Sequence, residues 1–193
     1  MLKIHFNMKK IRVIGCIVTA MCLCLGMASC SEDDDNATGN NGVAKLGNNT
    51  FNVPFGFWHT GDEDSDSKVD DNLVMLEFYS FDPLSNNFPG SMSVVSIEYE
   101  LPEGQKEITS TVLKGDEYDF YVVHGVTMSS SGIQCESIRS DSGNPDLKIV
   151  RNGNTYSISI KNLKVYAGDT ADDISYNFPF DYNGQLTHRQ IAE

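Results

Sequence analysis

Cysteine is nearly absent from the greater part of this 193-residue chain. Beyond residue 30 only Cys135 remains, and the other four are Cys16, Cys22, Cys24 and Cys30. A lone thiol cannot form an internal disulfide, and no CxxC zinc spacing occurs after Cys30. We therefore expect the roughly 145 residues that follow an N-terminal region to form one domain held by a hydrophobic core.

Basic residues are also scarce after residue 30. All 27 Asp and Glu lie beyond Cys30, whereas four of the 14 Lys and Arg precede it. The chain from Cys30 onwards thus has 10 basic and 27 acidic groups, a formal charge of −17. Such a chain repels phosphate backbones and anionic membrane surfaces, so we expect no nucleic-acid partner.

Catalytic motifs are missing as well. The chain after residue 30 has no Gly-x-Ser-x-Gly elbow and no HExxH zinc motif. Cys135 and His124 are its only Cys–His option, and a small hydrolase would need them within about 3.5 Å of each other. Glycoside hydrolysis needs a pair of carboxylates, but in so acidic a chain the presence of such a pair is no evidence for that activity. We predict no catalytic residue and no cofactor.

The first thirty residues have a different character. A basic start, Met8-Lys9-Lys10-Ile11-Arg12, precedes an almost wholly apolar run over residues 13–25, and small residues follow. This order is typical of a secretory signal peptide, and the run is short of the roughly 20 residues that span a membrane. We predict a signal peptide over residues 1–29; an uncleaved membrane anchor is the alternative.

Met27-Ala28-Ser29-Cys30 resembles a bacterial lipobox, although Met27 stands where Leu is more usual. An acidic run comes directly after it and resembles the export signal of surface lipoproteins in Bacteroidota-type Gram-negatives: Ser31, Glu32, Asp33, Asp34 and Asp35. The resemblance implies lipid on Cys30, attachment to the outer membrane through that lipid, and exposure on the cell exterior. An acidic run also keeps any tether solvated, which is the plainer interpretation.

Residues 30–48 are acidic and then rich in Asn and Gly. We predict a flexible tether that holds the domain on the order of 20–25 Å from its anchor.

Residues 49–193 have the alternation of β-strands, and no window of 11 residues has a helical period. Apolar residues alternate over 51–57, 95–101 and 174–182, while residues 73–81 form a denser run expected of a strand buried on both faces. Residues 147–160 predict a hairpin that turns at Asn152-Gly153. The apolar residues after Asn162 alternate with the opposite parity to those before it, which predicts a bulge or bend near Asn162. About nine strands predict an all-β fold, a β-sandwich or a partly open barrel. We favour the sandwich, because Pro54 and Pro179 suggest edge strands.

An acidic loop follows the first of these strands. Asp62, Asp64 and Asp66 have the spacing of a calcium loop, but Ser67 replaces the required Gly and Leu73 the bidentate Glu. We therefore favour a solvated loop over a metal site.

Two further features could contact a ligand or carry a modification. Trp58 and His59 stand at a strand end, where an aromatic ring can stack on a sugar or a partner protein. The alternation places Phe57 in the core and Trp58 on the opposite face, unless the following loop covers it. Asp169-Thr170-Ala171 resembles the O-glycosylation acceptor of the same bacterial group, which would modify Thr170; an ordinary loop is the alternative.

These features favour a cell-surface lipoprotein with a non-enzymatic binding module for an extracellular glycan or protein partner. The alternative is a periplasmic, barrel-like carrier enclosing a small apolar ligand, which would require a cavity lined by Phe and Tyr. A small hydrolase is the third hypothesis.

Overall fold

The computed structural model describes residues 40–46, 48–60, 72–85, 90–129, 132–140, 145–167 and 175–189. The side chains of 123–129, 132–140, 166–167 and 175 lie outside that description. Residues 36–82 and 89–193 belong to one compact unit, the β-domain. Of a second unit only residues 83–85 are described, and they lie in a turn and bend. No helix within the described ranges is long and apolar enough to cross a membrane.

The described part of the β-domain is built from strands, which confirms the all-β prediction. The strands are β1 (Asn41–Leu46), β2 (Asn49–Asn52), β3 (Phe55–Thr60), β4 (Leu73–Tyr79), β5 (Met92–Glu100), β6 (Thr111–Leu113), β7 (Tyr118–Ser129), β8 (Gly132–Ser140), β9 (Leu147–Asn152), β10 (Thr155–Ile160), β11 (Lys164–Ala167), β12 (Ser175–Asn177) and β13 (Phe180–His188).

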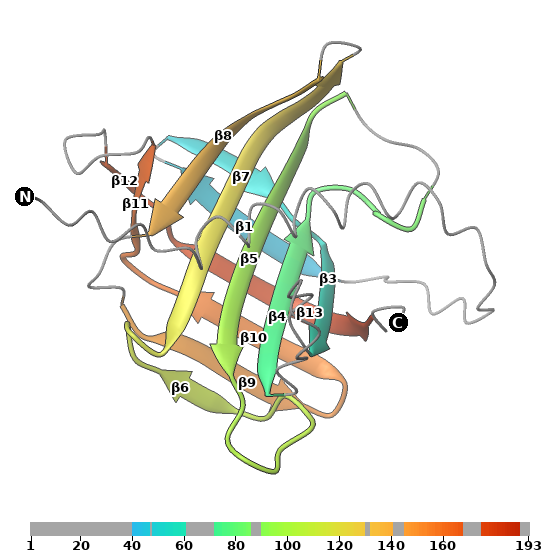
Figure 1. Cartoon of the computed structure of the whole chain (residues 1–193), viewed down its shortest axis with the longest axis vertical. Coiled ribbons are helices and arrows are strands. Elements are labelled where there is room, and N and C mark those ends of the chain that lie inside the picture. Colours follow the sequence, from blue (N-terminus) through green and yellow to red (C-terminus); the bar gives the residue numbers. More distant parts are fainter. Residues whose placement is uncertain are drawn as a thin grey trace, which may run out of the picture. The chain divides into compact units, whose positions relative to one another are not determined.

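The strands form two layers that share β13. Sheet A runs in the order β2-β1-β13-β10-β9-β6, and sheet B runs β12-β11-β8-β7-β5-β4-β3. Figure 1 shows β8, β7, β5 and β4 side by side in one layer, with β1, β13, β10 and β9 behind them. β13 first pairs with β10 through residues 180–185 and then runs parallel to β3 through residues 186–188. This shared strand joins the layers on one side, so the fold lies between a sandwich and a barrel.

The two prolines that suggested edge strands mark the places where the chain changes sheets. β2 lies in sheet A and β3 in sheet B, with Pro54 between them; β12 lies in sheet B and β13 in sheet A, with Pro179 between them. Each predicted continuous strand is therefore two strands, and this is one reason why the described residues form thirteen strands where about nine were expected. Proline suits these crossings because it has no N–H to donate to a ladder.

The β-domain begins earlier than the predicted residue 49. β1 pairs with both β2 and β13, and Ala44 and Leu46 are buried, so residues 41–46 are not tether. The alternation of this strand is weak in the sequence, because Gly42 has no side chain and Ala44 has only a methyl group. Gly42 permits a close approach, because a Cβ there would lie 2.1 Å from the carbonyl oxygen of Val53.

Other local predictions hold with small shifts. β4 is buried on both faces, as its dense apolar run predicted. The β9–β10 hairpin forms, but its turn residues are Gly153 and Asn154, because Asn152 pairs with Thr155. Gly153 has a φ of 60°, which is typical of a type II′ turn. The predicted bend at Asn162 is present as a φ of 60°.

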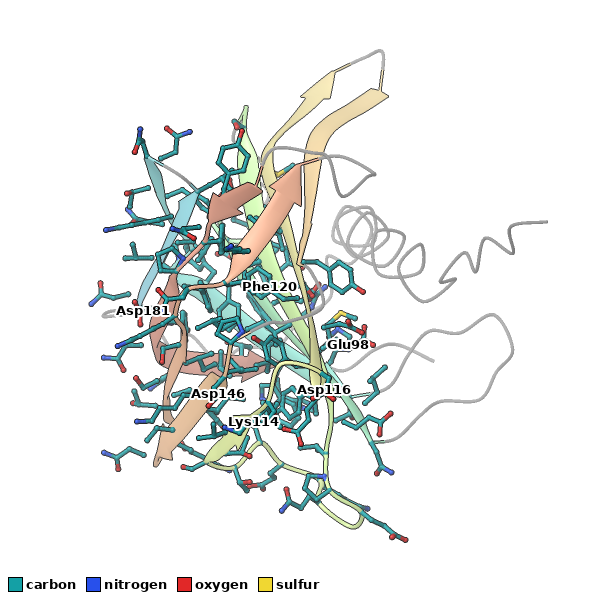
Figure 2. The ribbon with its side chains drawn as sticks, turned by 90° about the vertical axis from the view of Figure 1, so that its left-hand side faces the viewer. Glu98, Lys114, Asp116, Phe120, Asp146 and Asp181 are labelled. Atoms are coloured by element: carbon teal, nitrogen blue, oxygen red, sulfur yellow. The ribbon has the colours of Figure 1, made fainter. Side chains whose placement is uncertain are left out.

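Aromatic rings pack the space between the sheets. Phe78 of sheet B lies 4.9 Å from Phe180 and 4.7 Å from Tyr182 of sheet A, ring centre to ring centre. Phe120 lies 5.4 Å from Phe178 at one of the crossings. In Figure 2, Phe120 lies between the two layers. Glu98 lies on the side of sheet B that is turned away from sheet A, and Asp181 lies on the opposite side of the domain.

Candidate functional site

Sheet B carries a second set of buried side chains on the face turned away from sheet A. Strand alternation sends every second residue of β3, β4, β5 and β7 to this side. We call it the outward face of sheet B, and its members are between 0% and 6% exposed: Phe57, Met75, Glu77, Tyr79, Val94, Ser96 and Tyr121. An antiparallel sheet that faces water has polar residues there, so this face is unusually apolar.

Glu77 lies at the centre of this face and is paired with an arginine from the end of β13. The Arg189 Nη1 donates to Glu77 Oε2 at 3.1 Å and lies 3.5 Å from Tyr79 Oη. The guanidinium also lies over the ring of Phe57, 5.7 Å from its centre. The backbone N–H of Arg189 donates to the Trp58 carbonyl at 2.9 Å, which continues the β3–β13 pairing and fixes this geometry.

Burial dominates the ionisation of Glu77. Its side chain is 1% exposed, and loss of water raises the pKa of the carboxyl above its ordinary value. Hydrogen bonds and charge from Arg189, together with a hydrogen bond from Tyr79, oppose that rise. A charge so placed needs its partner, because an unpaired buried carboxylate is strongly destabilising.

His59 lies on the same face beside the ion pair. Its Nε2 is 3.9 Å from Glu77 Oε2, too far for a hydrogen bond, and its buried Nδ1 has no hydrogen-bond partner. Burial, with smaller effects from the charges of Arg189 and His188, lowers the pKa of His59 to about 4. His59 is therefore neutral near pH 7 and offers an unused hydrogen-bonding nitrogen.

Ser96 is the second polar group on this face without a partner. It pairs in register with Glu77 on one side and Tyr121 on the other, and it is 0% exposed. Its hydroxyl makes no hydrogen bond. Buried hydroxyls are nearly always hydrogen-bonded, so this one calls for an explanation.

Two carboxylates form an acidic rim at one end of the face. Glu98 and Asp119 are direct cross-strand neighbours on β5 and β7; Asp119 is exposed and Glu98 is half-buried. Burial raises the pKa of Tyr121, and the two rim carboxylates add to the rise. Negative charge thus borders the apolar centre.

Trp58 and His59 point to opposite sides of β3. Trp58 is half-buried, packs against the core between the sheets, and stacks on exposed His188 at 4.2 Å between ring centres. The predicted positions of Phe57 and Trp58 are therefore reversed. The alternation from Phe51 does not continue through Pro54, because the chain changes sheets there.

The chain matches no known family model, no curated protein and no solved structure.

Several predicted sites lie outside the described residues. These are the lipidation site Cys30, the export signal over residues 31–35, the acidic triplet Asp62, Asp64 and Asp66, and the glycosylation candidate Thr170. The side chains of His124 and Cys135 are also outside the description, although the backbone places them on the adjacent strands β7 and β8. Among the side chains that are described, no three His, Cys, Asp or Glu group to hold a metal ion.

Sequence reasoning identified His59 but missed Glu77, Arg189 and Ser96. A signal for Glu77 was present, because it is the only charged residue in the apolar run of residues 73–81. An isolated acid in such a run predicts either a buried pair or a functional group. Nothing local could identify Arg189, which lies 112 residues further along the chain.

Proposed function

We propose that this protein is a lipid-anchored, non-enzymatic binding module, displayed on the outer membrane, that holds its partner on the outside of the β-domain. The structural observation that carries the proposal is the filled space between the two sheets, which directs any partner to the outside of the β-domain. The inner side of sheet B is packed against sheet A by aromatic rings, and its outward face holds the Glu77–Arg189 pair among apolar side chains that are themselves buried.

The packing between the sheets supports an external site over an internal one. A carrier of small apolar ligands needs a cavity lined by Phe and Tyr. Here Phe78 contacts both Phe180 and Tyr182 across the layers at less than 5 Å between ring centres. The rings fill the space that a ligand would occupy.

The chemistry around Glu77 favours binding over catalysis. Its carboxyl is engaged by Arg189 and Tyr79, and His59 stands outside hydrogen-bond distance of it. A general acid–base pair requires hydrogen-bond reach to each other or to the reacting group. The ion pair is better suited to ordering a surface than to moving a proton.

The attachment and the location rest on the sequence, through the lipobox at Cys30 and the acidic residues after it. The test is protease digestion of the domain on intact cells, with a lysed control and a variant lacking residues 31–35. We expect digestion on intact cells and protection in the variant. Protection of the native protein until the outer membrane is broken would contradict surface display.

A further inference from the structure

We propose that the outer face of sheet A, the side turned away from sheet B, binds an uncharged glycan chain. The chain lies across the strands and is held by hydrogen bonds to exposed amides and hydroxyls. This assignment rests on the proposed function, because it names the partner class and the surface of a binding module whose interior is filled.

The outer face of sheet A is open to solvent. Along β10, Tyr156 and Ile158 point into the core, so Ser157 between them points outward and is exposed. Asn183 is the direct neighbour of Ser157 on β13, and Asn41 is the direct neighbour of Asn183 on β1. Three uncharged polar side chains therefore stand in one row across three strands.

A second row of the same chemistry lies beside the first. Gln185 of β13 pairs with Thr155 of β10, and Thr155 pairs with Asn152 of β9. We call the two rows together the amide–hydroxyl strip, and every member is exposed: Asn41, Asn152, Thr155, Ser157, Asn183 and Gln185. Amides and hydroxyls both donate and accept hydrogen bonds, so the strip offers both kinds of group over four adjacent strands.

The amide–hydroxyl strip differs in charge from the rest of the chain. None of its six members ionises, whereas the chain from Cys30 onwards has 27 acidic and 10 basic groups. The charged side chains elsewhere on the strands of this face are Lys45, Lys148 and Asp181, two basic groups and one acidic. Figure 2 shows Asp181 on this outer side. The face is thus nearly neutral on a strongly acidic protein.

These properties favour a glycan over other classes of partner. The formal charge of −17 repels nucleic acid. Centres of protein interfaces are rich in aromatic residues, Met and Arg and poor in Ser, and the strip has none of the first three. Each hydroxyl of an uncharged glycan both donates and accepts a hydrogen bond, which matches the amides and hydroxyls of the strip without a need for opposite charge.

The geometry of the strip indicates how the glycan lies. Its members stand on β1, β13, β10 and β9, and neighbouring strands are about 4.7–4.9 Å apart. This spacing is close to the length of one sugar unit, so a chain across the strands places about one sugar over each. The sheet fixes the backbone, and short Ser, Thr and Asn side chains lose less rotamer freedom on binding than Lys or Glu. Because each solvent-exposed hydrogen bond is weak, affinity grows with the number of sugars in contact.

The test is affinity electrophoresis of the full chain in gels that contain a soluble polysaccharide. The uncharged probes are dextran, pullulan, mannan and mixed-linkage β-glucan, and the acidic probe is polygalacturonate. We expect at least one uncharged probe to retard the chain and polygalacturonate to leave its mobility unchanged. Oligosaccharides of the retarding probe should bind more tightly with each added sugar up to about four, one for each strand of the strip.

Alanine variants separate the strip from the rest of the surface. Asn183→Ala removes an amide from the centre of the strip, whereas Asn72→Ala removes an exposed amide next to β4 in sheet B. Both residues are exposed, so both variants should fold. Asn183→Ala should weaken binding at least threefold, the double variant Asn183→Ala with Thr155→Ala at least tenfold, and Asn72→Ala less than twofold.

Failure of all four uncharged probes to retard the chain would overturn the proposal. Equal loss of binding in Asn183→Ala and Asn72→Ala would also overturn it, because the glycan would then bind elsewhere. So would retardation by polygalacturonate as strong as that by an uncharged probe. Each of these results leaves surface display intact, whereas protection from protease on intact cells would refute the proposed function itself.

Discussion

At the scale of single residues, the feature that needs most explanation is a carboxylate in the middle of an apolar strand. Glu77 stands between Leu76 and Phe78, both of which point into the core, and its own side chain points to the outward face. Arg189 and Tyr79 surround it there. A buried ion pair of this kind is weak evidence for stability, but loss of one partner leaves the other uncompensated.

Removal of Arg189 should therefore be much more harmful than removal of the whole pair. We expect Arg189→Ala to lower the free energy of unfolding by about 3 kcal/mol, the lower end of the range for broken buried pairs, because Arg189 is 22% exposed. The double variant Glu77→Leu with Arg189→Met should lose less than Arg189→Ala alone. Urea unfolding of the three proteins measures the difference. A loss below about 1 kcal/mol in Arg189→Ala would show that the pair does not hold the C-terminal end of β13.

The pKa of His59 predicts a dependence of stability on pH. In the folded state this pKa is lowered to about 4, below the ordinary value of 6.5. Between pH 6.5 and 4 the unfolded chain therefore binds more protons than the folded one, so stability falls as the pH falls. The total loss from His59 is at most about 3 kcal/mol, from 1.36 kcal/mol per pH unit.

Glu77 acts in the opposite direction, since its raised pKa favours the folded state at low pH and that contribution is lost as the pH rises. His59→Asn isolates the histidine. Urea unfolding at pH 7, 5.5 and 4.5 should show a smaller loss of stability in this variant than in the native chain. Identical pH profiles would contradict a buried, neutral His59.

The residue scale is also where sequence reasoning reaches least far. The alternation of apolar residues predicts which side chains share a face, but it does not predict which distant residue completes a pair. His59 was identified because it adjoins Trp58, whereas Arg189 acquires its role only when β13 reaches β3. The positions of Phe57 and Trp58 were reversed because a change of sheet at Pro54 leaves no mark in the alternation itself.

At the scale of elements, the parallel contact between β3 and β13 positions the site. It holds Arg189 over Phe57 and His188 over Trp58. The contact depends on Gly56, because a Cβ there would lie 2.6 Å from Tyr182 Oη and 2.7 Å from Leu186 Cδ2. Glycine is required here for close packing and not for backbone freedom.

Gly56→Ala should therefore lower the free energy of unfolding by about 1–3 kcal/mol, as overpacking usually does. It should also displace His188 from Trp58, which is the sole tryptophan and so reports the change in its fluorescence. Gly90→Ala is the matched control, since nothing lies within 4 Å of a Cβ at that position. Equal behaviour of the two variants would contradict the close approach of β3 and β13.

The elements themselves could be predicted better than their assembly. Period-two alternation identified β5 and the β9–β10 hairpin, and a dense apolar run identified β4 as buried on both faces. The β1 strand was missed, because two of its buried positions are Gly42, which has no side chain, and Ala44, which has only a methyl group. The parallel β3–β13 pair could not be predicted, because it joins segments from the two ends of the domain.

At the scale of the whole molecule, the all-β class follows from composition and period, while the joined sheets follow from two crossings that the sequence marks only with proline. Sheet B also has two different sides. One side packs aromatic rings against sheet A, and the other keeps apolar side chains around Glu77 and Arg189. The side chains on both sides are buried, and burial of each large apolar side chain contributes about 1.5–3 kcal/mol to the stability of the domain.

The most direct test compares neighbouring methyl groups that point to opposite sides of sheet B. Met75 and Val94 lie on the outward face, while Leu76 and Val95 point into the core. Methyl NMR of the full chain in the presence of a soluble paramagnetic agent measures how closely solvent approaches each group. We predict that Met75 and Val94 are protected as well as Leu76 and Val95, because all four side chains are 0–4% exposed. Strong relaxation of Met75 and Val94 would contradict the burial of the outward face around Glu77.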